Sequence, residues 1–125
     1  MLDKNKLKVL PIHDAELISF LFTQDDTGNT RILFDIKITD DSYDCGYEIP
    51  KKNCFTSLVF ENCWWIKNEF YLNVTIRDTI NRLDSIENSK IKKNKDIKTK
   101  GEHYYIEFNS GSKFEIIAED IYLMA

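Results

Sequence analysis

The sequence contains few of the residues that build metal sites, disulfide frameworks or phosphate-binding loops. Its 125 residues include three Cys, two His, four Gly and two Pro. The cysteines, Cys45, Cys54 and Cys63, are odd in number and form no Cys-x-x-Cys pair, the spacing that commonly begins a zinc site. We therefore expect buried free thiols, no metal and no cofactor.

Long apolar runs and a basic charge excess are also missing. No stretch approaches the ~20 apolar residues of a membrane span, and the first residues, MLDKNKLK, scatter charges where a secretory signal has an apolar core. The net charge of −4 lacks the excess of Lys and Arg that a nucleic-acid or anionic-membrane binder normally carries. We expect a cytoplasmic protein that binds neither nucleic acid nor membrane.

The common catalytic motifs are absent as well. The sequence has no Gly-rich phosphate loop, no HExxH and no GxSxG. His13-Asp14 is the only dipeptide that resembles a catalytic pair, and neighbouring side chains on a strand point to opposite faces. We expect Asp14 to bond backbone amides where the first strand begins, and we predict no catalytic residue and no enzyme activity.

Apolar and aromatic residues are abundant. A chain that is 42% hydrophobic and 13% aromatic has ample surface to bury, so we expect residues 1–125 to form one folded domain. Repeated period-2 segments predict a mainly β fold. The prediction is an antiparallel sheet, either curved or arranged as a two-layer sandwich, with at most one short helix.

The clearest signal is a β-hairpin in residues 102–124. Asn109 to Ser112, NSGS, supplies turn residues between two alternating runs. One face of this hairpin is apolar and should enter the core: Tyr104, Ile106, Phe108, Phe114, Ile116 and Ala118. We expect the rest of the chain to be arranged around it.

The preceding residues predict further strands and turns. Residues 18–23 and 30–39 are expected to form a hairpin around a turn at 24–29, with Ile32, Phe34, Ile36 and Ile38 on one face. Residues 54–66 are apolar on both faces, with Leu58, Phe60 and Trp64 expected on one and Val59, Cys63 and Trp65 on the other. A turn at 67–69 should lead to a strand at 70–76.

The remaining segments are weaker. Residues 40–44 are polar and predict a loop, and residues 45–49 predict a short edge strand ended by Pro50. Helical spacing of Ile76, Ile80 and Leu83 allows one helical turn over 77–83, followed by a strand at 84–91. Residues 1–8 and 90–101 are expected to be flexible or loop.

Several segments together resemble a family. These are His13-Asp14-Ala15-Glu16-Leu17, Leu58-Val59-Phe60-Glu61-Asn62-Cys63, Asp84-Ser85-Ile86 and the run from Tyr104 to Ile121. The pattern is similar to small bacterial β-rich domains, some of which are assigned as immunity proteins encoded beside polymorphic toxins. The resemblance implies inhibition by direct binding, and it carries no catalytic residues over. The Trp64-Trp65 pair and the lysine-rich segment before Glu102 depart from the pattern.

If that resemblance holds, the partner is a toxin. Asp40, Asp41 and Asp44 are candidates for steering a basic toxin toward the chain, because complementary charge speeds encounter. Trp64, Trp65 and Tyr71 are candidates for anchoring it, although the two tryptophans also fit a core position. The alternatives are a structural domain that forms oligomers such as a homodimer, a β domain that binds a small ligand, and an unrecognised enzyme.

Overall fold

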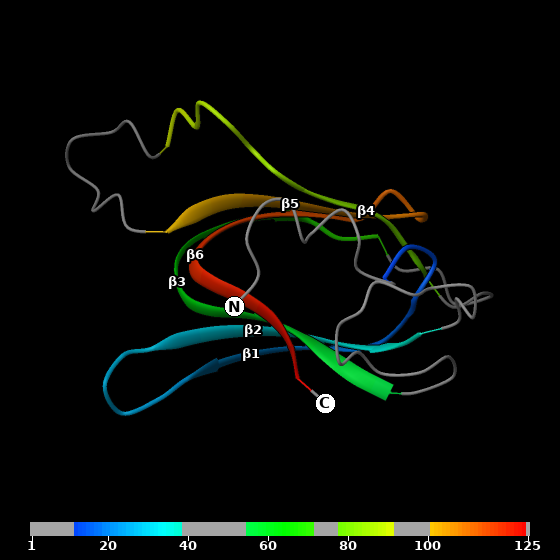
Figure 1. The fold of residues 1–125 in the computed structure, drawn as a ribbon, viewed down its shortest axis with the longest axis horizontal. Helices are drawn as coiled ribbons and strands as arrows, with labels where there is room; N and C mark the ends of the chain where they lie inside the picture. The colour runs from blue at the N-terminus through cyan, green and yellow to red at the C-terminus, as the bar shows by residue number, and fades with distance from the viewer. Residues whose placement is uncertain (1–11, 39–54, 72–77, 92–100, 125) are drawn as a thin grey trace, which may run out of the picture.

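The computed structural model describes residues 12–38, 55–71, 78–91 and 101–124. They form one antiparallel sheet in the order β1-β2-β3-β6-β5-β4, with no helix among these residues (Figure 1). The strands are β1 (Glu16–Gln24), β2 (Thr30–Lys37), β3 (Phe55–Glu69), β4 (Ile80–Ser85), β5 (Glu102–Phe108) and β6 (Lys113–Met124). The predicted mainly β class is confirmed.

The C-terminal hairpin lies at the centre of this sheet. β6 pairs with β3 on one side and with β5 on the other. Its turn is closed by the Phe108 amide, which donates to the Ser112 carbonyl oxygen at 2.8 Å. Gly111 in this turn has φ +95°, a conformation that costs glycine little and other residues more. The predicted hairpin is confirmed.

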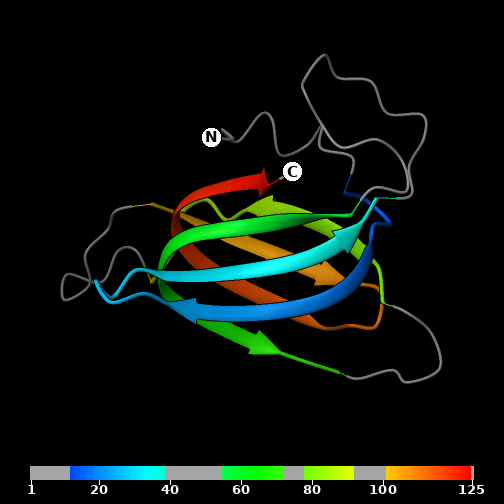
Figure 2. The ribbon, with the colours of Figure 1, turned by 90° about the horizontal axis from the view of Figure 1, so that it is seen from below.

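The sheet curls until its two edge strands meet at one end. The Leu17 amide donates to the Asp78 carbonyl at 2.8 Å, and the Ile80 amide donates to the Ala15 carbonyl at 3.0 Å. Figure 2 shows the strands wrapping around a common interior. Of the two predicted architectures, the structure has the curved sheet rather than the two-layer sandwich.

The interior of the curl is the core. All strands after β1 send fully buried or nearly buried apolar side chains into it. Its members include Phe34, Phe60, Phe108, Phe114, Tyr104, Ile32, Ile36, Leu58, Ile80, Ile106, Ile116 and Ile121. The inward face predicted for the C-terminal hairpin is confirmed, and Ile38 is buried as expected.

A bulge in β3 changes two expectations for this part of the chain. Asn62 has φ +53°, and the pairing with β6 shifts register between Cys63 and Trp65. The bulge adds a residue, so that Cys63 and Ile66 both pack on the core, on the face of Leu58 and Phe60. The face predicted for Cys63 is therefore wrong, whereas Trp65 lies on the face opposite Phe60, as predicted. The turn predicted at 67–69 is also wrong, because β3 continues through Glu69, which pairs with Lys113.

The region after residue 77 also differs from the prediction. Ile80 and Leu83 are buried from a strand, β4, and not from a helical turn. A register shift between Ile80 and Arg82 explains the misleading spacing, because a bulged strand places inward residues three apart, as a helix does. The strand predicted at 84–91 ends at Ser85, and turns follow. The predicted strand at 45–49 and the loops at 1–8 and 40–44 lie outside the described residues.

Candidate functional site

Four exposed aromatic side chains come from β1 and from the residues directly after β3. Phe20 and Phe22 come from β1, and Phe70 and Tyr71 directly follow β3; their exposed fractions are 40%, 53%, 47% and 55%. Soluble proteins expose single apolar residues routinely, but a group of large aromatic residues marks an interaction surface. We call these four residues the aromatic rim.

The aromatic rim rests on the core through ring contacts. The Phe20 ring lies 5.3 Å from that of Phe34 and 5.2 Å from that of Phe114. The Phe70 ring lies 6.1 Å from that of Phe114. The central β6 residue Phe114 therefore supports the rings of Phe20 and Phe70, one from each part of the rim.

The backbone beneath Tyr71 is also fixed. The Tyr71 amide donates to the Ser112 hydroxyl at 2.8 Å, and that hydroxyl donates to the Tyr71 carbonyl at 3.1 Å. Ser112 is fully buried in the turn of the C-terminal hairpin. The Tyr71 ring is therefore exposed on an anchored backbone, which agrees with its predicted place at the surface.

The two tryptophans lie elsewhere. Trp65 pairs with Ile117 across β6, and its ring lies 5.4 Å from the His103 ring, on the outer face of the sheet. Trp64 occupies the bulge, and both side chains are half-buried. Their predicted role in binding a partner stays a prediction. Asp40, Asp41 and Asp44, the predicted steering residues, lie outside the described residues.

His13 and Asp14 do approach one another, contrary to the strand geometry that we expected. Residues 12–14 form a turn in which Asp14 has φ +62°, and His13 Nε2 lies 3.5 Å from Asp14 Oδ2. Both side chains are largely exposed, and His13 Nδ1 lies 2.9 Å from the Asn81 carbonyl oxygen. This pair tethers the turn to β4, and it lines no described pocket.

A second cluster was missed from the sequence because its members are far apart in the chain. Ser89 Oγ lies 2.6 Å from His103 Nδ1, and His103 Nε2 lies 3.1 Å from Glu115 Oε1. A serine, an imidazole and a carboxylate in this order resemble a hydrolytic relay. However, Ser89 is only 5% exposed, so a carbonyl substrate cannot reach its oxygen. We interpret the cluster as a clamp that fastens residues 86–91 to the sheet.

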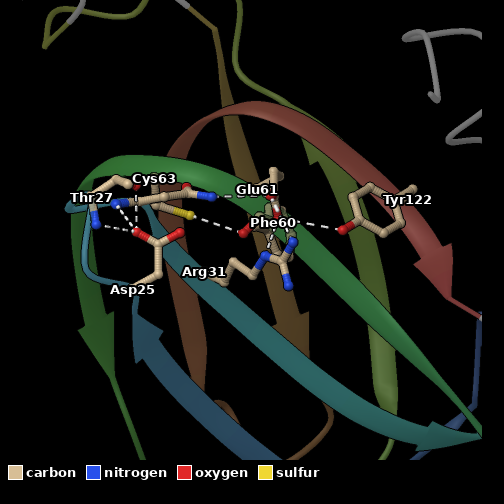
Figure 3. A network of polar contacts seen from close by, with 8 residues as sticks. Asp25, Thr27, Arg31, Phe60, Glu61, Cys63 and Tyr122 are labelled. Atoms are coloured by element: carbon tan, nitrogen blue, oxygen red, sulfur yellow. Dashed lines mark hydrogen bonds and ion pairs between the residues drawn. The ribbon is translucent and has the colours of Figure 1, made fainter.

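A polar network braces the outer face near the β1–β2 turn (Figure 3). The Arg31 guanidinium contacts both oxygens of Glu61, at 2.5 and 3.0 Å. Asn29 and Tyr122 donate to the same carboxylate at 3.1 and 3.3 Å. The bond from Arg31 is the main reason why the pKa of Glu61 lies below its usual value. Because both Glu61 oxygens are engaged, the network joins β2, β3 and β6 and leaves little capacity for a ligand.

Cys63 has the buried free thiol that the sequence predicts. Burial raises its pKa to about 12, and its thiol donates to the Phe60 carbonyl at 3.3 Å. A neutral, enclosed thiol is a poor nucleophile and a poor metal ligand. Within the described ranges, no group of three or more His, Cys, Asp or Glu is placed to hold a metal ion.

Two further observations bear on function. No helix among the described residues is long and apolar enough to cross a membrane. Comparisons with protein-family models, curated proteins and solved structures found no match.

Proposed function

We propose that this chain is a protein-binding domain of the immunity type, which neutralises a toxin by covering part of its surface. The observation that carries the proposal is the exposure of Phe70 and Tyr71 on a backbone fixed by buried Ser112. Exposed aromatic side chains on a rigid support are typical anchors of protein interfaces.

The fixed positions of the rim residues favour their use in binding a protein partner. A partner that binds mobile aromatic side chains must order them, at ~0.5–1.5 kcal/mol for each immobilised side chain. Phe70 packs near Phe114, so part of this cost is already met in the free domain, and the backbone of Tyr71 is fixed by Ser112. The surface therefore supports binding better than it supports chemistry.

The charge of the chain indicates the kind of partner. A net charge of −4 favours encounter with a basic protein over an acidic one. Many toxins that act on nucleic acids need basic surfaces to hold phosphates. A basic toxin would meet an acidic domain whose aromatic anchors exclude water from the contact.

The test is a growth assay in which cells make the product of the gene next to this one, with or without this chain. Wild type should restore growth. The double variant Phe70→Ser/Tyr71→Ser should fail to do so, because it removes both anchors from an exposed position. Phe55→Ser is the matched control, since Phe55 is 68% exposed and lies on β3 away from the rim.

Two results would contradict the proposal. One is that wild type gives no protection; the other is that the double variant, folded and equally abundant, protects as well as wild type. Thermal melts of the purified variants show whether they are folded.

A further inference from the structure

The hydrogen-bonding direction of β1 follows from its turn. The Asp25 amide donates to the Asn29 carbonyl at 3.0 Å, which makes residues 25 and 29 a hydrogen-bonded pair. Pairing is regular from Gln24 back to Ser19, and hydrogen-bonded pairs alternate with non-bonded ones in an antiparallel ladder. Odd-numbered residues such as Leu21 and Thr23 therefore bond to β2.

The backbone amides and carbonyls of the even-numbered residues of β1 consequently point away from β2. The amides and carbonyls of Phe20 and Phe22 point to the outer edge of the sheet. Beyond the bridge between Glu16 and Thr79, β1 has β2 as its one strand neighbour among the described residues.

This outer edge lacks the devices that usually prevent edge-to-edge pairing. Natural edge strands carry inward charges, Lys or Pro, or are very short. β1 has nine residues, and residues 17–24, LISFLFTQ, include neither a charge nor a proline. Its one irregularity is the register shift between Leu17 and Ser19, at the end that already meets β4. With respect to the described part of the chain, Ile18 to Gln24 therefore form an open template for another strand.

We propose that β1 pairs with β1 of a second copy of this chain, antiparallel, about a two-fold axis at Leu21. Bonding partners across such an axis must both have outward amides, which Phe20 and Phe22 provide. Phe20 of each copy then forms hydrogen-bonded pairs with Phe22 of the other, and Leu21 faces its own equivalent. This dimer goes beyond the proposed function, whose anchors are Phe70 and Tyr71, because it uses the β1 residues of the aromatic rim, Phe20 and Phe22.

The side chains are self-complementary in this register. Two Phe20–Phe22 pairs and one Leu21–Leu21 pair form across the axis, and aromatic and aliphatic cross-strand pairs stabilise a ladder. Phe20, Leu21 and Phe22 are 40–53% exposed in the single chain, so each has apolar surface left to bury. No charge faces a like charge between Ile18 and Gln24.

A second copy suits this edge better than a charged partner does. The ladder offers no ionic group for steering, and the net charge of −4 makes two copies repel at long range. Association should therefore tighten as salt is added, the opposite of the toxin complex proposed above. A contact of one strand pair is small, so we expect a dissociation constant on the order of 10 µM.

The test is sedimentation of the full chain carrying opposite charges at the axis. Leu21→Lys alone and Leu21→Glu alone each place like charges face to face, so each should weaken self-association by at least ~30-fold. An equimolar mixture should dimerise again, because Lys then faces Glu across the axis. Phe55→Lys, which alters a more exposed apolar residue on β3, should sediment as wild type.

The proposal is contradicted if wild type remains monomeric at ~200 µM, well above the expected dissociation constant. It is also contradicted if the single charge variants still dimerise, or if their equimolar mixture stays monomeric. The growth assay separates this inference from the proposed function. If wild type is monomeric and still restores growth, the dimer is contradicted and the immunity role is not. If wild type is dimeric and does not restore growth, the immunity role is contradicted and the dimer is not.

Discussion

The C-terminal hairpin and β1 carry similar patterns of apolar residues, and the fold uses them in opposite ways. In β6, Phe114, Ile116 and Ile121 are buried, because the strand lies between β3 and β5. In β1, Phe20 and Phe22 also come from the inner face, yet they are 40% and 53% exposed at the edge of the sheet. A strand's position in the sheet order thus decides whether its apolar face is buried in the core or stays exposed.

The largest expected effect is a difference in the free energy of unfolding between a substitution in β6 and one in β1. Phe114 contacts Phe20, Phe34, Phe70 and Phe108, so Phe114→Ala should lower the free energy of unfolding by ~3–5 kcal/mol. Phe22→Ala, at an exposed edge, should lower it by less than ~1 kcal/mol. Urea unfolding of both variants measures the difference. Equal losses would mean that β1 is as deep in the core as β6.

Two glycines, one before β5 and one after β1, allow the same comparison at the backbone. A Cβ added to Gly101, where β5 begins, would clash with the Ala118 carbonyl of β6. Gly28, in the turn after β1, has open space around it, although both residues have positive φ. Gly101→Ala should therefore lower the free energy of unfolding by ~2 kcal/mol or more, and Gly28→Ala by ~1 kcal/mol. Thermal melts that rank these variants in the reverse order would contradict the close packing of β5 on β6.

A smaller, pH-dependent effect on stability tests the polar network around Glu61, near the β1–β2 turn. The pKa of Glu61 is lower in the folded chain than in the unfolded one, chiefly because of the bond from Arg31. Its contribution is therefore present above the unfolded pKa, ~4.3, and is lost as pH falls through the folded pKa. Glu61→Gln should cost ~1 kcal/mol at neutral pH, a modest value because the Arg31 side chain is 45% exposed.

The difference between wild type and Glu61→Gln should then shrink as pH falls below the unfolded value. Urea midpoints measured from neutral to acidic pH provide the comparison. A difference that stays constant, or that grows toward acid, would show that the Glu61 carboxylate does not stabilise the sheet.

The last expected effect concerns the reactivity of Cys63 and not the stability of the fold. Its pKa of about 12 leaves almost no thiolate at pH 8, so a disulfide reagent should modify it on the order of 10³-fold more slowly than in the unfolded chain. The measurement uses Cys45→Ser/Cys54→Ser so that one thiol remains. Fast modification of the folded variant would place Cys63 near the surface rather than in the core.

Local patterns predicted the parts of the fold that depend on them. Alternation identified β1, β2 and the C-terminal hairpin, and Asn109 to Ser112 identified the turn. The bulges at Asn62 and near Arg82 misled the prediction, because an extra residue shifts the inward positions from period 2 to a spacing of three. Nothing local in the sequence marks these bulges.

The candidate site was only partly predictable, for a related reason. Tyr71 was expected at the surface, where it lies, but residues 18–23 were expected to form a hairpin strand, and nothing in that prediction indicated that Phe20 and Phe22 are exposed. Their exposure depends on β1 being an edge strand, which follows from the order of all six strands. The cluster of Ser89, His103 and Glu115 likewise depends on pairings that bring distant residues together.

Amide hydrogen exchange in the Leu21→Lys variant, resolved residue by residue, tests the central claim most directly. That claim is that the β5–β6 hairpin is the rigid centre and that the outer edge of β1 is open for pairing. We predict slow exchange for Ile106 and Ile116, protection of residue 21 and Thr23 by β2, and rapid exchange for Phe20 and Phe22. Protection of Phe20 and Phe22 equal to that of residue 21 and Thr23 would contradict the claim.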